Sequence, residues 1–524
     1  MEESEKWTWK KIAVLKINFC KFYVIRGTCF FVFLFIFWLK SVSQIQIYIY
    51  FEQMESLTLK SYIQWVEEWK INANEVVKSY LDNATNDVEN LHAYVRLHPE
   101  YVEKNLDNLK DLPLHWAPIA IKDNIMTKWY VSSCGSKMLE NYVAPYSATC
   151  FENLEKEWGL MLWKANMDEF AMWSSTEYSA FWNTKNPNWT DRIPWGSSGW
   201  SAAAVAWDLC LAALWTDTWG SIRQPAALCG IVWLKPTYGR VSRYWVQSMA
   251  SSFDQVWILT KTVEDARIML DAICGYDEND SQSKKKADIK DFDNLNLKES
   301  DIKIAVPNEA FTEALDPRVK ELFLAKIEEL KSHWYTVDYV DFPLLKYVWA
   351  IYYMLISAEV TSNLWRFDGI RFGLQEDMKW IKDLHEYYTK IRMEWFWNEV
   401  KKRILLGNYV VTKENYEKYY LRWYKARKLL QSEFTKFFKN YHAVVTPTTP
   451  TPASKFGEKS NNSLLMYLED LYTVPANLAW LPAISIPMWT VEDWWENLPV
   501  WIQLMWWKWQ EWLLLSVAEK IENK

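Results

Sequence analysis

The sequence predicts an α/β fold in which helices surround a mixed central sheet. Short apolar runs at residues 118–121 and 160–164 are typical of buried strands, and they alternate with segments whose apolar residues recur at helical spacing. A strand–helix–strand pattern across residues 301–340 indicates a βαβ unit. Hydrophobic residues make up 50% and charged residues 24% of the 524-residue chain, which is the mix of an ordinary globular protein.

The N-terminal half combines helices with buried strands. From residue 59 to about residue 97 the apolar residues fall at helical spacing. Residues 195–235 are rich in small residues and predict loops and short helices packed around a site. Residues 263–270 predict a helix, and the polar residues 277–300 predict a surface loop or linker with a solvated lysine run at 284–286.

The C-terminal half continues the alternation. Residues 301–306 alternate as a strand does, and Asp316 and Pro317 supply the N-cap and first-turn proline of a helix. Residues 335–340 and 443–447 predict further strands, and residues 347–438 predict mostly helix. The Pro/Thr/Ser-rich residues 448–463 predict a mobile flap.

Residues 1–53 differ from the rest of the chain. They join basic residues to an apolar run at 29–39, bracketed by Arg26 and Lys40 and shorter than the about 20 residues that span a bilayer. The run is either a signal-like or anchoring segment, or an over-extended piece upstream of a start at Met54. We favour the second reading, because residues 55–59 open an amphipathic helix without it. The prediction is a single domain over 54–524 with a helical insertion at about 345–440.

Charge and cysteine content exclude several classes of protein. The net charge of −7 gives no sign of a general nucleic-acid surface. The seven cysteines form no CxxC pair and no cluster with histidine, so we expect neither structural zinc nor a disulfide framework, and no metal site. A cytoplasmic location fits this cysteine usage best.

The composition is unusually rich in tryptophan and poor in glycine. The chain has 36 tryptophans and only 13 glycines, well under half of the average glycine usage of about 7%. Trp195, Trp200 and Trp219 stand in tight motifs, where an indole is sterically implausible. One hypothesis is that the source organism reads a stop-type codon as glycine and that this codon is rendered here as tryptophan. The alternative is a truly tryptophan-rich protein.

Two serine-rich motifs carry the chemistry. They read GSSGWS at residues 196–201 and TDTWGSIRQPA at residues 216–226. A serine nucleophile needs a base, and none of the six histidines lies in a serine-rich motif. A lysine can act as that base when burial lowers its pKa, and Lys122 directly follows the apolar run 118–121. The alternative interpretations are that Ser197 is an ordinary loop hydroxyl and that Lys122 is a surface lysine beside Asp123.

With glycine at positions 195, 200 and 219, these motifs resemble the amidase-signature family from residue 112 to about 272. The resemblance implies the amidase-signature fold and a triad of Lys122 as base, Ser197 as proton relay and Ser221 as nucleophile. It also places the backbone N–H groups of Thr218, Trp219, Gly220 and Ser221 at an oxyanion hole. Asp217 and Arg223 are expected to be a buried pair that holds the loop, and Cys134 a packed thiol.

Further motifs resemble one branch of that family, the A subunits of tRNA-dependent amidotransferases. They include KANMDEFAM at 164–172, LKPTYGRVSRY at 234–244 and RFDGIR at 366–371. The resemblance implies that the chain hydrolyses glutamine and supplies ammonia to a B subunit, with a small C subunit stabilising the pair. The B subunit would use ATP and Mg²⁺ to activate Glu-tRNA(Gln), with Asp-tRNA(Asn) left open. We expect no cofactor in this chain and no association with a membrane.

Free glutamine presents a carboxylate and an ammonium group, so its pocket needs opposite charges. Arg403 can hold the carboxylate by a bidentate fork, and Asp470 can receive the ammonium group. By motif Tyr353 lines this pocket, with Tyr352 as the close alternative. The competing interpretation of Arg403 is a solvated helix charge beside Lys402.

Two other functions remain open. A stand-alone amidase acting on a neutral amide would have the same fold, with an apolar pocket in place of Arg403 and Asp470. A non-catalytic scaffold subunit would follow if tryptophan truly occupies positions 195, 200 and 219.

Overall fold

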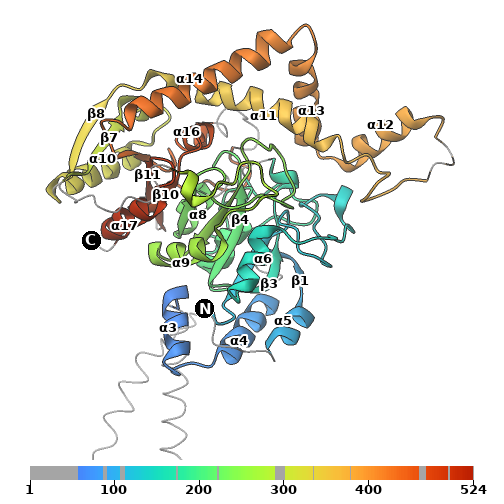
Figure 1. The fold of residues 1–524 in the computed structure, drawn as a ribbon, viewed down its shortest axis with the longest axis horizontal. Coiled ribbons are helices and arrows are strands. Elements are labelled where there is room, and N and C mark those ends of the chain that lie inside the picture. The colour runs from blue at the N-terminus through green and yellow to red at the C-terminus, as the bar shows by residue number, and fades with distance from the viewer. Residues whose placement is uncertain are drawn as a thin grey trace, which may run out of the picture. The chain divides into compact units, whose positions relative to one another are not determined.

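A computed structural model describes residues 57–522, except 87–90, 107–112, 173–174, 221–222, 290–300, 334, 378, 380, 460–467 and 494–495. Thr58–Lys524 forms one compact unit. Its centre is a mixed sheet of eleven strands among the described residues, in the order β1-β3-β2-β4-β6-β5-β10-β11-β9-β7-β8, with helices around it (Figure 1). The predicted fold class is confirmed. The N-terminal segment 1–53 and the end of the predicted flap lie outside the described residues.

The first half of the sheet comes from the N-terminal half of the chain. Strands β3 and β4 pair in parallel with the two sides of β2, and β6 then runs antiparallel to β4 and to β5. Every residue of β2, β3, β4, β5 and β6 is buried, which explains their continuous apolar sequences. The strands are β1 Tyr94–Leu97, β2 Pro118–Lys122, β3 Leu160–Ala165, β4 Ala212–Asp217, β5 Val232–Lys235 and β6 Gln255–Thr260.

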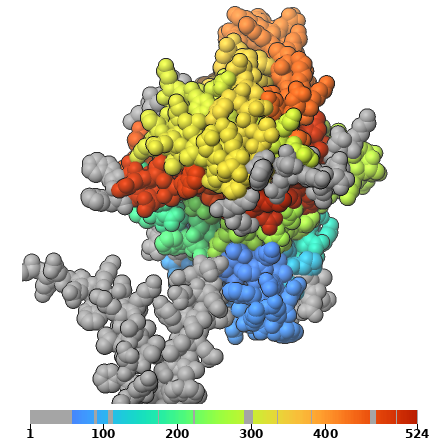
Figure 2. Space-filling model, turned by 90° about the vertical axis from the view of Figure 1, so that its left-hand side faces the viewer, coloured from blue at the N-terminus to red at the C-terminus, as the bar shows by residue number. Residues whose placement is uncertain are grey.

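The second half of the sheet is joined to the first by one long hairpin. Strands β10 and β11 pair with each other, β10 also pairs with β5, and β11 also pairs with β9. In Figure 2 the red C-terminal residues accordingly form a band between the green residues and the yellow ones. The strands are β7 Lys303–Pro307, β8 Thr336–Val340, β9 Ala443–Pro447, β10 Ala483–Asp493 and β11 Glu496–Trp506.

Helices pack on the sheet and on one another. Helices α11, α13 and α14 gather in one layer, shown in yellow and orange in Figure 1, within the stretch predicted to be helical. The α-helices of at least six residues are α3 Leu59–Glu67, α4 Ala73–Asn86, α5 Pro99–Leu106, α6 Thr149–Lys156, α7 Gly199–Ala206, α8 Arg223–Cys229, α9 Val263–Ile273, α10 Pro317–Ser332, α11 Val348–Leu364, α12 Leu384–Trp395, α13 Asn398–Val411, α14 Arg422–Phe437, α16 Val474–Ala479 and α17 Glu511–Glu522. No helix of the described residues is long and apolar enough to cross a membrane.

Most predicted elements are present. The βαβ unit is confirmed: β7 and β8 pair in parallel, α10 connects them, and the Asp316 side chain caps α10 by accepting from the Arg318 N–H. The buried strands at 118–121 and 160–164 and the helix at 263–270 are also found, as β2, β3 and α9.

Three predictions were wrong in part. The helical spacing does not continue to residue 97, because Tyr94–Leu97 forms strand β1 and pairs with β3. Over four residues the apolar pattern fits the period of a helix as well as that of a strand. Residues 195–235 contain the central strands β4 and β5 besides loops and short helices. Residues 277–283 are not a solvated linker, because the Asp277 and Asp280 side chains are buried in hydrogen bonds to Ser242 and Arg243.

Tryptophans occupy backbone conformations that favour glycine. Among the described residues, eight of the fifteen with positive φ other than glycine are tryptophan. Trp69 and Trp158 directly follow the C-caps of α3 and α6, and Trp480 caps α16 in the left-handed conformation. This position at a helix end is where glycine is normally found, because it has no Cβ to clash. The others are Trp116, Trp129, Trp195, Trp245 and Trp509.

Other tryptophans are buried with their polar atom unsatisfied. Within the described part of the chain, eight buried indole N–H groups find no hydrogen-bond partner. A buried tryptophan N–H normally has a partner, because leaving it unpaired costs about 1–3 kcal/mol. The eight residues are Trp116, Trp163, Trp195, Trp200, Trp215, Trp219, Trp233 and Trp257.

We therefore expect the protein from its source organism to carry glycine at Trp69, Trp158 and Trp480, and at the motif positions Trp195 and Trp219. Glycine removes the Cβ clash at the first four positions, where φ is positive, and the unpaired indole at the last. Peptide mass spectrometry of the native protein measures each position directly. Tryptophan at these five sites would contradict the codon hypothesis.

Candidate active site

The candidate site lies where the parallel strands β2 and β4 end side by side. Their pairing, with Ile121 opposite Leu214, places Lys122, the last residue of β2, beside the last residues of β4. The loop before α7 brings Ser197 to the same place, and the Gly196–Ser197 peptide bond is cis. The carboxyl ends of parallel strands meet at one edge of a sheet, which is where α/β proteins bind their ligands.

Lys122 is completely buried, and its ammonium group lies beside Ser197. Its Nζ donates to Ser197 Oγ at 3.1 Å and to the Thr216 carbonyl at 3.1 Å. Burial lowers the pKa of Lys122 to about 7, although the carboxylates of Asp217 and Asp168 oppose that shift. A lysine with this pKa is partly neutral near neutral pH and can accept a proton. The surface-lysine alternative is therefore excluded.

The loop that carries Ser197 has no room for a side chain at Gly196. A Cβ there would lie 2.2 Å from Asp168 Oδ2 and 2.7 Å from the Thr176 nitrogen. The two Asp168 oxygens accept the backbone N–H groups of Thr176 at 3.2 Å and Tyr178 at 3.0 Å. Burial raises the pKa of Asp168 to about 7. Sequence reasoning did not assign Asp168 a part in the site, although its motif at 164–172 was noticed.

Ser221, the predicted nucleophile, lies outside the described residues, and its role stays a prediction. The backbone before it is described as far as Gly220. There the N–H groups of Trp219 and Gly220 both donate to Asp217 Oδ1, each at 2.7 Å. The predicted oxyanion hole is thus not open at these two residues, because the Asp217 carboxylate already accepts both donors. For Thr218 the prediction stays as it was.

Asp217 and Arg223 form the predicted buried pair. Their side chains are fully buried and lie 3.3 Å apart, from Arg223 Nη2 to Asp217 Oδ2. The Arg223 guanidinium also donates to Gln503 Oε1 at 2.9 Å, to Asn477 Oδ1 and to the Thr473 carbonyl, and it thereby ties this loop to the C-terminal half.

Cys134 is a buried thiol whose pKa burial raises well above its usual value, so the packed-thiol prediction is confirmed. The five described cysteines are free thiols. A thiol with a raised pKa is rarely ionised near neutral pH and is a poor nucleophile. The serine chemistry therefore has no competing thiol at this position.

Arg403 is buried and not a solvated helix charge. It is fully buried on α13, and its Nε donates to Glu399 Oε1 at 2.9 Å. Its Cζ lies 4.4 Å from the centre of the Trp219 ring and 5.8 Å from that of Tyr353. Tyr352 is also present, with its ring centre 5.0 Å from that of Trp219. The structure therefore brings Arg403 and both candidate tyrosines to the loop that precedes Ser221.

Asp470 lies on the other side of that loop. It is 2% exposed, and a Cβ built on Gly220 would lie 3.4 Å from Asp470 Oδ1. This oxygen has no hydrogen-bond partner among the described residues, and burial raises the pKa of Asp470 well above its usual value. A buried carboxyl oxygen without a partner is costly unless a donor meets it. Within the described part of the chain no group of acidic, histidine or cysteine side chains could hold a metal ion.

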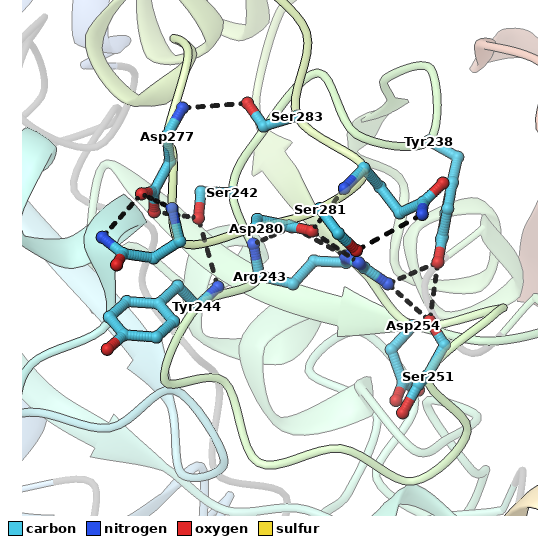
Figure 3. A network of polar contacts seen from close by, with 12 residues as sticks. Tyr238, Ser242, Arg243, Tyr244, Ser251, Asp254, Asp277, Asp280, Ser281 and Ser283 are labelled. Atoms are coloured by element: carbon cyan, nitrogen blue, oxygen red, sulfur yellow. Dashed lines mark hydrogen bonds and ion pairs between the residues drawn. The ribbon is translucent and has the colours of Figure 1, made fainter.

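A cavity of about 690 Å³ has Gln247, Arg243 and Asp254 among its lining residues. Asn124 Nδ2 donates to Thr216 Oγ1 at 2.8 Å and approaches the Gln247 carbonyl at 3.5 Å, so the cavity wall is linked to the strand end that holds Lys122. On another side of the cavity Arg243 pairs with Asp280 and donates to the Tyr238 hydroxyl and the Ser251 carbonyl (Figure 3).

A buried lysine hydrogen-bonded to a serine, in the pair Lys122 and Ser197, is part of the arrangement predicted for an amidase-signature enzyme. The chain matches the Amidase family over residues 75–515 and belongs to that family. The A subunit of the glutamyl-tRNA(Gln) amidotransferase of Sulfurihydrogenibium sp. (strain YO3AOP1) is 41% identical to it over 474 residues, which cover 89% of this chain and 96% of that protein.

Solved structures agree with this assignment. The protein of the same name from Thermotoga maritima is 35% identical, with a TM-score of 0.72 over 90% of this chain and 95% of that one. A 6-aminohexanoate cyclic dimer hydrolase reaches a TM-score of 0.76 over 89% of this chain and 96% of that one at 20% identity, a likeness of fold alone.

We expect amide hydrolysis to rise with pH through a limb near pH 7, because the reactive form of Lys122 is the neutral amine and its pKa is about 7. Asp168→Asn removes a carboxylate that favours the protonated lysine, so the limb should move to lower pH. The measurement is kcat/KM against pH for the two proteins. A limb that stays in place after Asp168→Asn would mean that Lys122 and Asp168 do not interact.

Proposed function

We propose that this chain is the glutaminase subunit of a tRNA-dependent amidotransferase. The observation that carries the proposal is the 3.1 Å contact between the buried Lys122 Nζ and Ser197 Oγ. It occurs in a chain that aligns with 96% of the A subunit of a glutamyl-tRNA(Gln) amidotransferase. The product of the whole complex would be Gln-tRNA(Gln) made from Glu-tRNA(Gln), with Asn-tRNA(Asn) from Asp-tRNA(Asn) as the open second product.

In the proposed reaction Ser221 Oγ attacks the side-chain amide carbon of glutamine. The Ser221 proton passes through the Ser197 hydroxyl to the neutral amine of Lys122. The tetrahedral intermediate then breaks its carbon–nitrogen bond, and the leaving nitrogen takes a proton back along the same path and departs as ammonia. Water hydrolyses the acyl-enzyme to glutamate and frees Ser221. Lys122 needs a pKa near 7 for both directions of proton transfer.

The charges around the loop 218–220 support an amino-acid substrate. Arg403 would bind the glutamine carboxylate and Asp470 its ammonium group, with Tyr353 or Tyr352 between them. Burial raises the pKa of Tyr352 well above its usual value, and Arg403 opposes that shift while Asp470 adds to it. A stand-alone amidase for neutral amides would not need a buried arginine and a buried aspartate beside this loop, so we place that function second.

Ammonia is protonated in bulk water, so it must reach the second reaction inside the complex. The cavity lined by Gln247 is a candidate exit, because Asn124 links Gln247 to Thr216, whose carbonyl accepts from Lys122. The partner B subunit would hold ATP and Mg²⁺ and activate the tRNA-bound glutamate, and a C subunit would stabilise the pair. We place the complex in the cytoplasm, in keeping with the free thiols.

A scaffold function has one specific observation in its favour. If the protein truly carries tryptophan at position 219, the indole lies against Arg403, where the substrate carboxylate would bind. The tryptophan form of the chain would then assemble with its partners without hydrolysing glutamine.

Ser221→Ala should lower glutamine-dependent Gln-tRNA formation by roughly 10⁴-fold or more, because no acyl-enzyme can form. The same complex should still make Gln-tRNA from added ammonium, since only the ammonia source is lost. Both activities are measured on the full complex with ATP and Glu-tRNA, in which glutamine hydrolysis should also be faster than in the isolated chain. A mutant complex that fails with ammonium as well would mean that Ser221 is needed beyond glutamine hydrolysis.

Arg403→Ala should lower kcat/KM for glutamine by about 30-fold or more, mainly through KM, because the substrate carboxylate loses its buried partner. Hydrolysis of a neutral amide without that carboxylate should change much less. Lys402→Ala is the matched control, since the neighbouring Lys402 side chain is 52% exposed and should leave both substrates unaffected. Equal losses on both substrates would assign Arg403 to the fold.

A further inference from the structure

Helix α14 and the turn before it carry a row of three tyrosines. The turn, Tyr416–Leu421, is π-helical and runs directly into α14 at the outer side of the helical layer (Figure 1). The ring centres of Tyr416 and Tyr420 lie 5.1 Å apart and those of Tyr420 and Tyr424 lie 6.4 Å apart, and both pairs are stacked. Their three hydroxyl groups form no hydrogen bond with a described residue. π-Helical turns are rare and frequently lie at functional sites.

Four exposed cations flank this row, and none of them forms an ion pair within the described part of the chain. Residues 418–432 contain five basic residues and no acidic one, so no charge in this stretch compensates them. Lys428 Nζ lies 5.6 Å from the centre of the Tyr424 ring, which places cations and tyrosines on one surface. We call this surface the α14 face, and it consists of Tyr416, Lys418, Tyr420, Arg422, Tyr424, Lys425 and Lys428. It contains no tryptophan.

The α14 face has the chemistry of a surface that binds a polyanion. Its lysines and arginine are donors only, and a tyrosine hydroxyl can donate as well. Burial raises the pKa of Tyr420 and the Glu359 carboxylate adds to that shift, but both Glu359 oxygens already accept from Ser252. A nucleic-acid backbone offers a row of phosphate oxygens, and lysine, arginine and tyrosine are among their usual partners. Arg422 and Lys428 lie roughly 9 Å apart along the helix axis, which spans neighbouring phosphates of one strand.

The α14 face is fixed to the loop that lines the large cavity. Arg427, on the buried side of α14, donates through Nη1 to Ser252 Oγ at 2.8 Å and through Nη2 to the Ser252 carbonyl at 3.0 Å. The preceding residue, Ser251, lines the cavity and accepts from Arg243 at its wall (Figure 3). A nucleic acid on the α14 face would therefore be held by the helix that anchors the cavity loop.

We propose that the α14 face binds the phosphate backbone of tRNA. The cations contact neighbouring phosphates, and the tyrosine hydroxyls donate to phosphate or ribose oxygens. The proposal rests on the proposed function for the choice of tRNA among polyanions. It adds a tRNA contact on this chain to those that the B subunit makes, and it places that contact outside the site of glutamine hydrolysis.

The test measures binding of tRNA(Gln) to the full complex by fluorescence anisotropy at several salt concentrations. The triple variant Arg422→Gln, Lys425→Gln and Lys428→Gln keeps the long side-chain stems and removes three charges. It should weaken tRNA binding by about tenfold or more and reduce the slope of log K against log salt by about 3, one for each lost phosphate contact. With ammonium as nitrogen source, KM for Glu-tRNA should rise by a similar factor at unchanged kcat. Tyr424→Phe removes one hydroxyl group and should weaken binding about threefold without changing the salt slope.

The triple variant Lys78→Gln, Lys320→Gln and Lys436→Gln is the matched control. It removes three exposed charges on α4, α10 and the far end of α14, and it should bind tRNA as the unchanged complex does. Arg422→Lys keeps the charge and should also bind normally, and thermal melting checks the fold of each variant.

Equal tRNA binding and equal salt slopes with and without the three substitutions on the α14 face would overturn the proposal. Loss of the B or C subunit from that variant in gel filtration would also overturn it, because the face would then belong to a protein partner. A complex that binds tRNA through the α14 face but makes no Gln-tRNA would uphold the proposal and contradict the proposed function.

Discussion

The site depends on one buried ammonium group at the end of strand β2. Lys122 has no exposed surface, and desolvation disfavours its charged form strongly enough to bring its pKa to about 7. Asp217 and Asp168 limit that shift, and each is fixed in turn, Asp217 by Arg223 and Asp168 by two backbone N–H groups. The surrounding structure thus keeps a lysine between its charged and neutral forms, as a proton acceptor at neutral pH requires.

The sequence predicted those parts of the fold that have one strong local signal. Strands β2 and β3 are continuous apolar runs, and α10 begins at an aspartate N-cap followed by proline, so both could be recognised without tertiary information. Strand β1 could not, because its four residues are short enough for either period and only pairing with β3 decides between them. Strand β4 was hidden by the small and presumed loop-forming residues around it, although its neighbours β2 and β6 bury it completely.

Only part of the candidate site could be predicted from the sequence, because some of its contacts depend on the three-dimensional structure. Motif order pointed to Lys122 and Ser197, and the structure places them in contact. A sequence motif does not determine where a backbone N–H group points. The N–H groups of Trp219 and Gly220 donate to Asp217 in the structure. Arg403 could be seen as buried only in three dimensions, because its sequence neighbours Lys401 and Lys402 suggest a solvated helix face. Asp168 was missed because its contact with the Ser197 loop is made through space, at Gly196.

The position of the β10–β11 hairpin has a consequence for biosynthesis. These strands, at residues 483–506, are the last of the sheet to leave the ribosome, yet they lie in its middle and pair with β5 on one side and β9 on the other. Until they emerge, the nascent chain holds two partial sheets with unpaired edges at those strands, and such edges are prone to aggregate. The Arg223 contact to Gln503 forms only when this last segment arrives, after Thr473 and Asn477 have emerged. A nascent chain cut short before residue 483 would therefore lack the middle of its sheet and the Gln503 contact that helps to hold Arg223.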